Sequence, residues 1–201
     1  MFEIAEYIGI IAFVISGFLV GVRNKLDLLG ILISTFLTAF GGGLIRDVIV
    51  NRTPYSFTHT APGILVIVLM LAMIISKIHK KPNLENRVLF ILSDSIGLVS
   101  FSISGALLAL NVNYNLTGVM ALSFITAVGG GITRDVIINE VPFVFKTGFY
   151  GTIALLVGLL IYLLNLLNFI NFFTLLIVFL LGIIVRVIAF YKKWSIPLGQ
   201  I

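Results

Sequence analysis

The sequence predicts an all-α membrane protein with seven transmembrane helices, arranged as two inverted three-helix repeats plus one extra C-terminal helix. The first observation behind this prediction is composition, since 60% of the 201 residues are hydrophobic and only 10% are charged. A water-soluble domain of this size needs far more charge to cover its surface. The other two observations are a series of long apolar segments and an internal repeat.

Seven apolar segments meet or approach the length of about 20 residues that a helix needs to cross a bilayer core of about 30 Å. Short stretches with turn-like composition separate most of them. Together the segments use almost the whole chain, so we expect no soluble domain. The predicted spans are residues 4–22, 28–50, 62–78, 88–110, 116–138, 149–164 and 169–190.

Lys and Arg gather on one side of this predicted topology, and by the positive-inside rule that side is cytoplasmic. The N-terminus is then outside and the C-terminus is in the cytoplasm. The net charge of +5 is explained by this asymmetry, so we expect no nucleic-acid partner. The residues assigned to the cytoplasmic side are Arg23, Lys25, Lys77, Lys80, Lys81, Arg87, Lys146, Arg186, Lys192 and Lys193, and Arg52 is on the other side.

The two halves of the chain align without a gap when the sequence is shifted by 88 residues. Many Gly, Pro and charged positions then coincide; Pro54 falls on Pro142, and Glu6 falls on Asp94. Each half contains three predicted spans, an odd number, so the second half must enter the membrane from the opposite side. We expect a first repeat at residues 1–81, a second repeat at 88–168, and a seventh helix with a short cytoplasmic tail at 169–201.

The most unusual motif is GGGLIRDVI at residues 41–49, which returns as GGGITRDVI at 129–137. Three consecutive glycines cost a helix about 3 kcal/mol relative to alanine. We expect the glycines to break both helices near mid-membrane, where freed backbone groups can line a water-filled cavity. The alternative is close helix packing through small residues. The glycines concerned are Gly41, Gly42, Gly43, Gly129, Gly130 and Gly131.

Each glycine triplet is followed by an Arg-Asp pair, Arg46-Asp47 and Arg134-Asp135. Ionisable residues at membrane depth indicate a functional site. Neighbours in sequence lie about 100° apart on a helix and do not face each other. We therefore expect each arginine to find an acidic or carbonyl partner outside its own helical turn, or to face a polar cavity. The leading candidates for pairing across the bundle are Asp135 for Arg46 and Asp47 for Arg134. The alternative is that these charges only fix their two helices in place.

Further polar residues lie in the predicted spans and are candidates to line a pore. On the fourth span, serines and a glycine recur on one helical face, a pattern that more often reflects packing than a pore. The candidates are Thr38, Thr126, Ser16, Ser104, Ser100, Glu6 and Asp94.

No enzyme motif is present. The chain has no cysteine, and its two histidines, His59 and His79, are too far apart to indicate a metal site. It also lacks HExxH and a phosphate-binding glycine loop followed by lysine. We expect no enzymatic activity, no cofactor and no fixed metal site.

With its two inverted triplets of spans, its seventh span and its doubled GGGLIRD and GGGITRD motifs, the chain resembles the short prokaryotic branch of the trimeric intracellular cation channel family. The resemblance covers nearly the whole chain. It implies a homotrimer in the plasma (inner) membrane of a prokaryote. It also implies one pathway per protomer, between the repeats, that conducts monovalent cations such as potassium past the glycines.

Related bacterial sequences are commonly labelled glycine transporters. The alternative function is therefore transport of a small neutral amino acid such as glycine. A small-residue stripe on the sixth span, formed by Thr147, Gly151, Ala154 and Gly158, is the physical feature that favours helix contacts between protomers.

Overall fold

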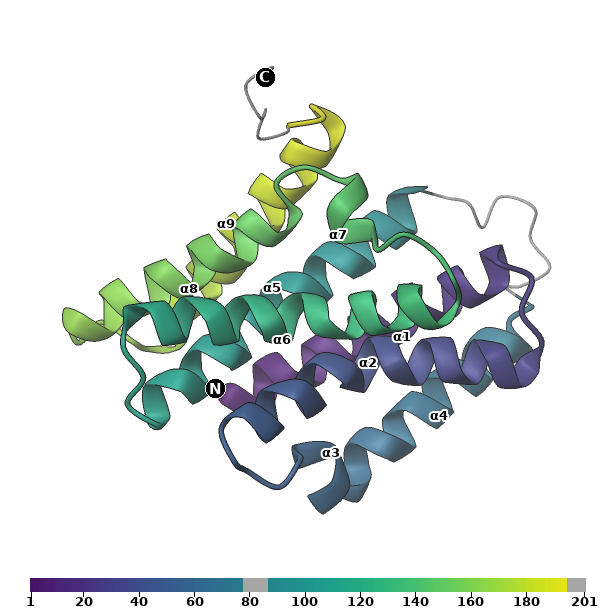
Figure 1. Cartoon of the computed structure of the whole chain (residues 1–201), viewed down its shortest axis with the longest axis horizontal. Helices are drawn as coiled ribbons and strands as arrows, with labels where there is room; N and C mark the ends of the chain where they lie inside the picture. The colour runs from purple at the N-terminus through teal and green to yellow at the C-terminus, as the bar shows by residue number, and fades with distance from the viewer. Residues whose placement is uncertain (78–86, 195–201) are drawn as a thin grey trace.

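The computed structural model describes residues 1–77 and 87–194, so His79, Lys80 and Lys81 lie outside the described residues. All regular structure in the described residues is helical (Figure 1). The helices are α1 (Phe2–Arg23), α2 (Leu28–Ile49), α3 (Tyr55–Thr58), α4 (Thr60–Ile75), α5 (Arg87–Asn111), α6 (Leu116–Ile137), α7 (Phe143–Lys146), α8 (Tyr150–Leu166) and α9 (Phe172–Tyr191).

Five of these helices, α1, α2, α5, α6 and α9, are long and apolar enough to cross a membrane. The helices α4 and α8 are apolar but shorter, with 16 and 17 residues. Large apolar side chains are exposed on the outside of the bundle, for example Ile67 of α4 at 53%, which suits contact with lipid. The prediction of an all-helical membrane protein is confirmed.

The helices α2 and α6 begin in the same way. Asp27 caps α2 by accepting a hydrogen bond from the Gly30 amide at 2.7 Å, and Asn115 caps α6 by accepting one from the Gly118 amide at 2.9 Å. A side-chain acceptor here satisfies an amide that has no partner within the helix. Both helices therefore start 13 residues before their glycine triplets, and they carry the triplets to matching depths.

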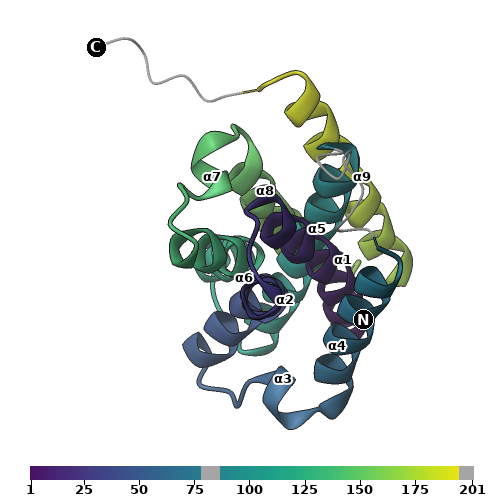
Figure 2. The ribbon, with the colours of Figure 1, turned by 90° about the vertical axis from the view of Figure 1, so that its right-hand side faces the viewer.

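Four helices form the centre of the bundle as two antiparallel pairs, α1 with α5 and α2 with α6 (Figures 1 and 2). Gly9 of α1 faces Phe101 of α5, Gly97 of α5 faces Phe13 of α1, and the two rings stack with centroids 5.2 Å apart. The second contact follows from the first by exchanging the repeats, that is, by adding 88 to the number of Gly9 and subtracting 88 from that of Phe101. The contacts between these helices thus follow a local two-fold symmetry.

The same symmetry holds where α2 crosses α6. A Cβ atom on Gly42 would touch the backbone oxygen of Thr126, and one on Gly130 would lie 2.5 Å from the backbone oxygen of Thr38. These two contacts are also related by a shift of 88. The glycine triplets therefore form the crossing point of α2 and α6, where the two backbones lie against each other.

The predicted helix breaks are wrong. Both α2 and α6 continue through their triplets, and the described residues include no glycine with positive φ. Glycine tolerates helical φ and ψ, and here the missing side chain lets two backbones meet. Packing across the crossing offsets the low helix propensity of the triplets. The packing alternative is the one that the structure supports.

The outer helices cover this centre. Figure 1 shows α4 on one side, and α8 and α9 together on the opposite side. Helix α4 packs against α1, α8 packs against α6 and α5, and α9 packs against α5 and α8. The small-residue stripe on α8 is used inside the protomer, since Gly151 faces Phe124 of α6, Gly158 faces Ser123 of α6, and Ala154 is fully buried. It therefore gives no support to a contact between protomers.

Candidate functional site

Arg46 of α2 is the centre of a buried charged cluster. Its guanidinium binds Glu6 of α1 through two contacts, Nη1 to Oε2 at 2.6 Å and Nη2 to Oε1 at 3.2 Å. It also donates from Nε to Asp47 at 2.8 Å and from Nη1 to the Ser104 hydroxyl of α5 at 3.0 Å. The Phe2 ring lies 4.9 Å from the guanidinium carbon. Arg46 is fully buried, so this cluster is closed, and one guanidinium contacts two carboxylates.

Arg134 of α6 occupies the equivalent position but has fewer partners. Its Nε and Nη2 atoms both contact Asp135 Oδ1 at 2.8 Å. Among the residues that the structure describes, the Nη1 atom donates to one group, the Thr38 hydroxyl of α2, at 3.4 Å. That distance is at the long end for a hydrogen bond, so the Nη1 end of this guanidinium is only weakly hydrogen-bonded.

The predicted cross-bundle pairs, Arg46 with Asp135 and Arg134 with Asp47, are wrong. Each arginine instead folds back onto the aspartate that follows it, because its long side chain can reach along the helix surface. The second carboxylate oxygen of each aspartate accepts a hydrogen bond from the first backbone amide of the next short helix. Asp47 accepts from Tyr55 N at 2.7 Å, and Asp135 accepts from Phe143 N at 2.8 Å. The aspartates therefore also position α3 and α7. The expectation of an acidic or carbonyl partner outside the arginine's own turn is confirmed for Arg46 by Glu6. It is not met for Arg134, whose contact outside its own turn, among the described residues, is the Thr38 hydroxyl.

Asp94 of α5, the counterpart of Glu6, has a different environment. Its Oδ1 accepts a hydrogen bond from the Tyr150 hydroxyl at 3.1 Å, and its Oδ2 is buried with no hydrogen-bond partner among the described residues. Arg186 of α9 stacks on the Tyr150 ring, with its guanidinium carbon 4.7 Å from the ring centroid. Asp94 thus faces Tyr150 and α9, and no hydrogen bond joins it to Arg134.

Arg186, one of the basic residues assigned to the cytoplasmic side, does not lie at the surface of the bundle. This residue is 1% exposed and lies within the bundle, where it covers an aromatic ring. Sequence reasoning missed it as a site residue, although a signal was present, because Arg186 is the only charged residue in the predicted span 169–190.

Buried hydroxyl groups lie between the two arginines. Thr38 and Thr126, on either side of the glycine crossing, each donate to a carbonyl one turn back at 2.6 Å, so their oxygens can still accept. Ser104 contacts Arg46, and the Ser16 hydroxyl is buried without a partner among the described residues. Ser100 lies apart from this group, in an apolar groove between α1, α5 and α9.

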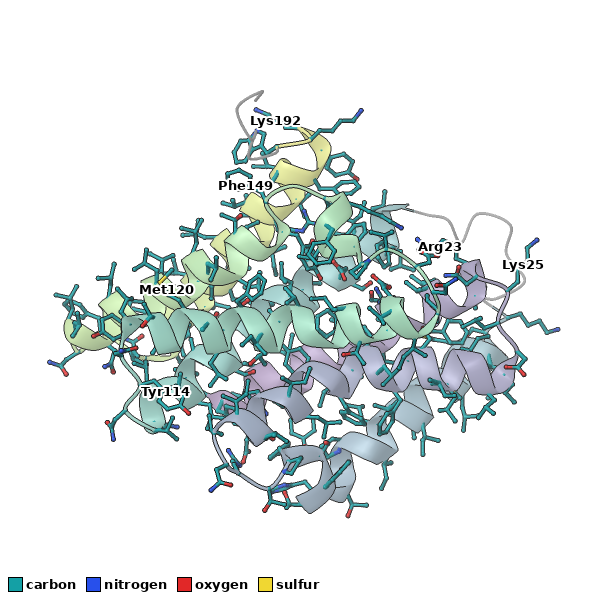
Figure 3. The ribbon with its side chains drawn as sticks, viewed as in Figure 1. Arg23, Lys25, Tyr114, Met120, Phe149 and Lys192 are labelled. Atoms are coloured by element: carbon teal, nitrogen blue, oxygen red, sulfur yellow. The ribbon has the colours of Figure 1, made fainter. Side chains whose placement is uncertain are left out.

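A cavity of about 260 Å³ opens beside Arg134. It is lined by Val20, Arg23, Phe90, Arg134, Asp135, Glu140, Val141, Phe143 and Lys146. Figure 3 shows Arg23 and Lys25 at one end of the long axis of the molecule and Tyr114 at the opposite end. The cavity is therefore at the end of the bundle where basic side chains collect.

Glu140 lies at the mouth of this cavity between two cations, Arg23 at 3.3 Å and Lys146 at 3.4 Å. Burial alone would raise the pKa of Glu140, but the charge of Arg23 and the hydrogen bond from Lys146 outweigh it, and the pKa is lowered. The carboxylate is therefore ionised at neutral pH and is already occupied by its two partners.

Among the residues that the structure describes, no group of three or more His, Asp or Glu side chains could hold a metal ion. His59 stacks on the Tyr55 ring with centroids 4.1 Å apart. Chemically, the arrangement places charged groups at Arg46 and Arg134, and hydroxyl groups between them, inside an otherwise apolar helix bundle.

Comparisons with known proteins match almost the entire chain. A family model described as "Glycine transporter" matches residues 3–80 and 91–165. The UPF0126 membrane protein YvgT of Bacillus subtilis is 33% identical over 97% of this chain and 95% of its own length. The UPF0126 inner membrane protein YadS of Escherichia coli is 30% identical over 77% of this chain and 74% of its own.

Solved structures are similar over the same extent. One, described as "Structural basis for conductance through TRIC cation channels", has a TM-score of 0.86 and 35% identity, covering 100% of this chain and 98% of the other. A crystal structure of a prokaryotic TRIC channel has a TM-score of 0.87 and 28% identity, covering 97% of this chain and 98% of the other.

Proposed function

Because the chain belongs to the prokaryotic trimeric intracellular cation channel family, we propose that it is a channel for monovalent cations, potassium among them. The proposed pathway lies within each protomer, between the first and second repeats. Three chains form a homotrimer in the inner membrane of a prokaryote, with seven spans per chain, α3 and α7 being too short to cross.

The observation that carries this proposal is the line of buried polar groups between the two charged clusters. On one side, Arg46 binds Glu6 and Ser104, and Glu6 lies beside Gly43 of the glycine triplet. On the other side, Thr38 at the crossing of α2 and α6 accepts from Arg134, which lines the cavity. Polar groups are costly inside a bilayer and mark ion pathways when they face the interior of a bundle. Contacts related by a shift of 88 residues support a pathway along the interface of the repeats.

The hydroxyl oxygens of Thr38 and Thr126 are suited to the passage of a partly dehydrated cation. An ion that sheds water needs oxygen ligands in its place, and both hydroxyls keep acceptor capacity beside the backbone at the glycine crossing. Both threonines are at most 1% exposed, so the described conformation is closed. Conduction requires α2 and α6 to move apart at the glycines, which have no side chains to interlock.

The orientation of the chain remains a proposal that rests on its charges. Arg23, Lys25 and Lys146 belong to the proposed cytoplasmic side, which places the N-terminus outside and the C-terminus in the cytoplasm. When a reporter protein is fused to the C-terminus, we expect its activity to be found on the cytoplasmic side of the membrane and not on the outer side. Activity only on the outer side of the membrane would contradict this orientation.

A second candidate function is transport of a small neutral amino acid such as glycine. It is favoured by the name of the family model and by the weakly hydrogen-bonded Nη1 end of Arg134, which suits a carboxylate. The two functions differ in how flux depends on concentration, because a carrier saturates and exchanges its substrate whereas an open channel passes ions down their gradient.

Flux into proteoliposomes that contain the purified protein separates the two functions. We expect potassium to enter down its gradient, without saturation at low millimolar concentration, and glycine uptake to match that of empty liposomes. Saturable uptake of glycine, with exchange for internal glycine and no potassium flux, would overturn the channel in favour of the carrier.

A further inference from the structure

The two repeats use their equivalent arginines differently. In the first repeat, Glu6 reaches Arg46 and forms a two-contact pair with its guanidinium at 2.6 and 3.2 Å. In the second repeat, the residue in place of Glu6 is Asp94, whose side chain is shorter by one methylene group. Asp94 instead accepts a hydrogen bond from Tyr150. No side-chain carboxylate of the described residues binds Arg134 in the way that Glu6 binds Arg46.

The guanidinium of Arg134 is nevertheless built to hold such a group. Asp135 contacts its Nε and Nη2, whereas Asp47 contacts only Nε of Arg46 and leaves both Nη atoms to Glu6. Among the described residues, the Nη1 atom of Arg134 has one contact, to Thr38 at 3.4 Å. The side chain is 2% exposed, so a ligand here would meet a buried guanidinium, and charge-assisted hydrogen bonds are among the strong ones.

The cavity beside Arg134 gives a small anion both space and charge. Its volume is about 260 Å³, and its lining contains three cations, Arg23, Arg134 and Lys146, and two carboxylates. Both carboxylates are already paired, Asp135 with Arg134 and Glu140 with Arg23 and Lys146. The lining therefore carries one positive charge more than its own acids neutralise.

We propose that Arg134 binds, through Nη1, the carboxylate group of a small soluble anion in this cavity, as Nη1 of Arg46 binds Glu6. The ligand class is small monocarboxylates, from formate and acetate to the carboxylate end of an amino acid. Glu6 serves as the internal template, since it shows that an arginine at this position of the repeat accepts an aspartate and a second carboxylate together. The inference concerns binding and does not depend on which solute crosses the membrane.

The test is the thermal unfolding of the full-length protein in mild detergent, titrated with sodium acetate against sodium chloride of equal concentration. We expect acetate to raise the unfolding midpoint saturably above its value in chloride. Glycine should do the same, and methylammonium chloride, which lacks a carboxylate, should have no such effect.

The Asp94→Glu variant separates the proposed site from a general effect of salt. Its longer side chain should reach Arg134 as Glu6 reaches Arg46, so the variant should unfold at a higher midpoint without acetate and gain nothing from acetate. The matched control is Glu6→Asp, the reverse exchange in the first repeat, which should keep the response to acetate.

Several outcomes would overturn the proposal. One is that acetate raises the unfolding midpoint equally in the wild type and in Asp94→Glu. Another is that acetate does not raise the midpoint of the wild type at all. A third is that glycine raises the midpoint but acetate does not, which would mean that a carboxylate does not suffice. Potassium flux is measured separately in liposomes, so failure of the proposed channel function would leave this result unaffected.

Discussion

The Gly42→Ala variant is expected to lose about 3 kcal/mol of stability or more, at the upper end of the usual cost of overpacking. The added Cβ would collide with the backbone oxygen of Thr126, and a backbone atom in a helix cannot turn away as a flexible side chain can. The two helices α2 and α6 must then separate at the crossing. Denaturant unfolding in mild detergent measures the loss.

The matched control for this variant is Gly63→Ala on α4. A Cβ atom at Gly63 would meet nothing within 4 Å, so alanine should leave the stability unchanged or raise it by at most about 1 kcal/mol through helix propensity. The double variant Gly42→Ala with Gly130→Ala should cost less than the sum of the single variants, because both collisions occur at one crossing. Equal stability of Gly42→Ala and Gly63→Ala would contradict close packing at the triplets.

The sequence was sufficient to predict the long helices and their symmetry, since apolar length predicts spans and a gapless 88-residue shift predicts a repeated unit. It also placed the glycine triplets at matching positions along antiparallel helices. It did not reveal whether the triplets break the helices or pack them, because that depends on what lies opposite Gly42 and Gly130. The oxygens of Thr126 and Thr38 lie there, and no local pattern records such a contact.

Side-chain partners were the least predictable part of the candidate site. Helix periodicity separated Arg46 from Asp47, but arginine is long enough to bend back and bind its neighbour at 2.8 Å. Aligning the repeats paired Glu6 with Asp94 and suggested equal roles. One methylene group, together with Tyr150 and Arg186, gives Asp94 a different partner. A difference of one methylene group changes which partner a carboxylate can reach, although both residues are acidic and align in the repeat.

The short helices α3 and α7 were also missed by sequence reasoning. Each has four residues and follows a proline, Pro54 or Pro142, and a single turn leaves no periodic signal. Each is held by the aspartate of the preceding Arg-Asp pair. The charges at the ends of α2 and α6 therefore have a structural role in addition to any role in ion passage.

The central claim is that cations pass along the buried polar groups between the repeats, and Ser104 provides a place to test it. The chain has no cysteine, so a single introduced thiol is the only one present. Ser104 is fully buried and contacts Arg46 at 3.0 Å. A cysteine replaces its hydroxyl with little change in size, and the nearby arginine favours the reactive thiolate. Thr126→Cys offers a second position on the same pathway.

The control position is Ile67 of α4, whose side chain is 53% exposed on the outside of the bundle. A cysteine there can also bind metal, but it lies away from the proposed pathway. Wild-type protein, without any thiol, sets the baseline for effects of the metal on other groups.

The decisive measurement is potassium flux through the Ser104→Cys variant before and after addition of silver ions, monovalent cations that bind thiolates tightly. Nitrate serves as the counter-ion to keep silver in solution. If cations follow the proposed pathway, silver should reach the thiol and remove nearly all of the potassium flux of Ser104→Cys, while Ile67→Cys and the wild type keep theirs. Undiminished potassium flux through Ser104→Cys and Thr126→Cys, or equal inhibition of Ile67→Cys, would contradict a pathway between the repeats.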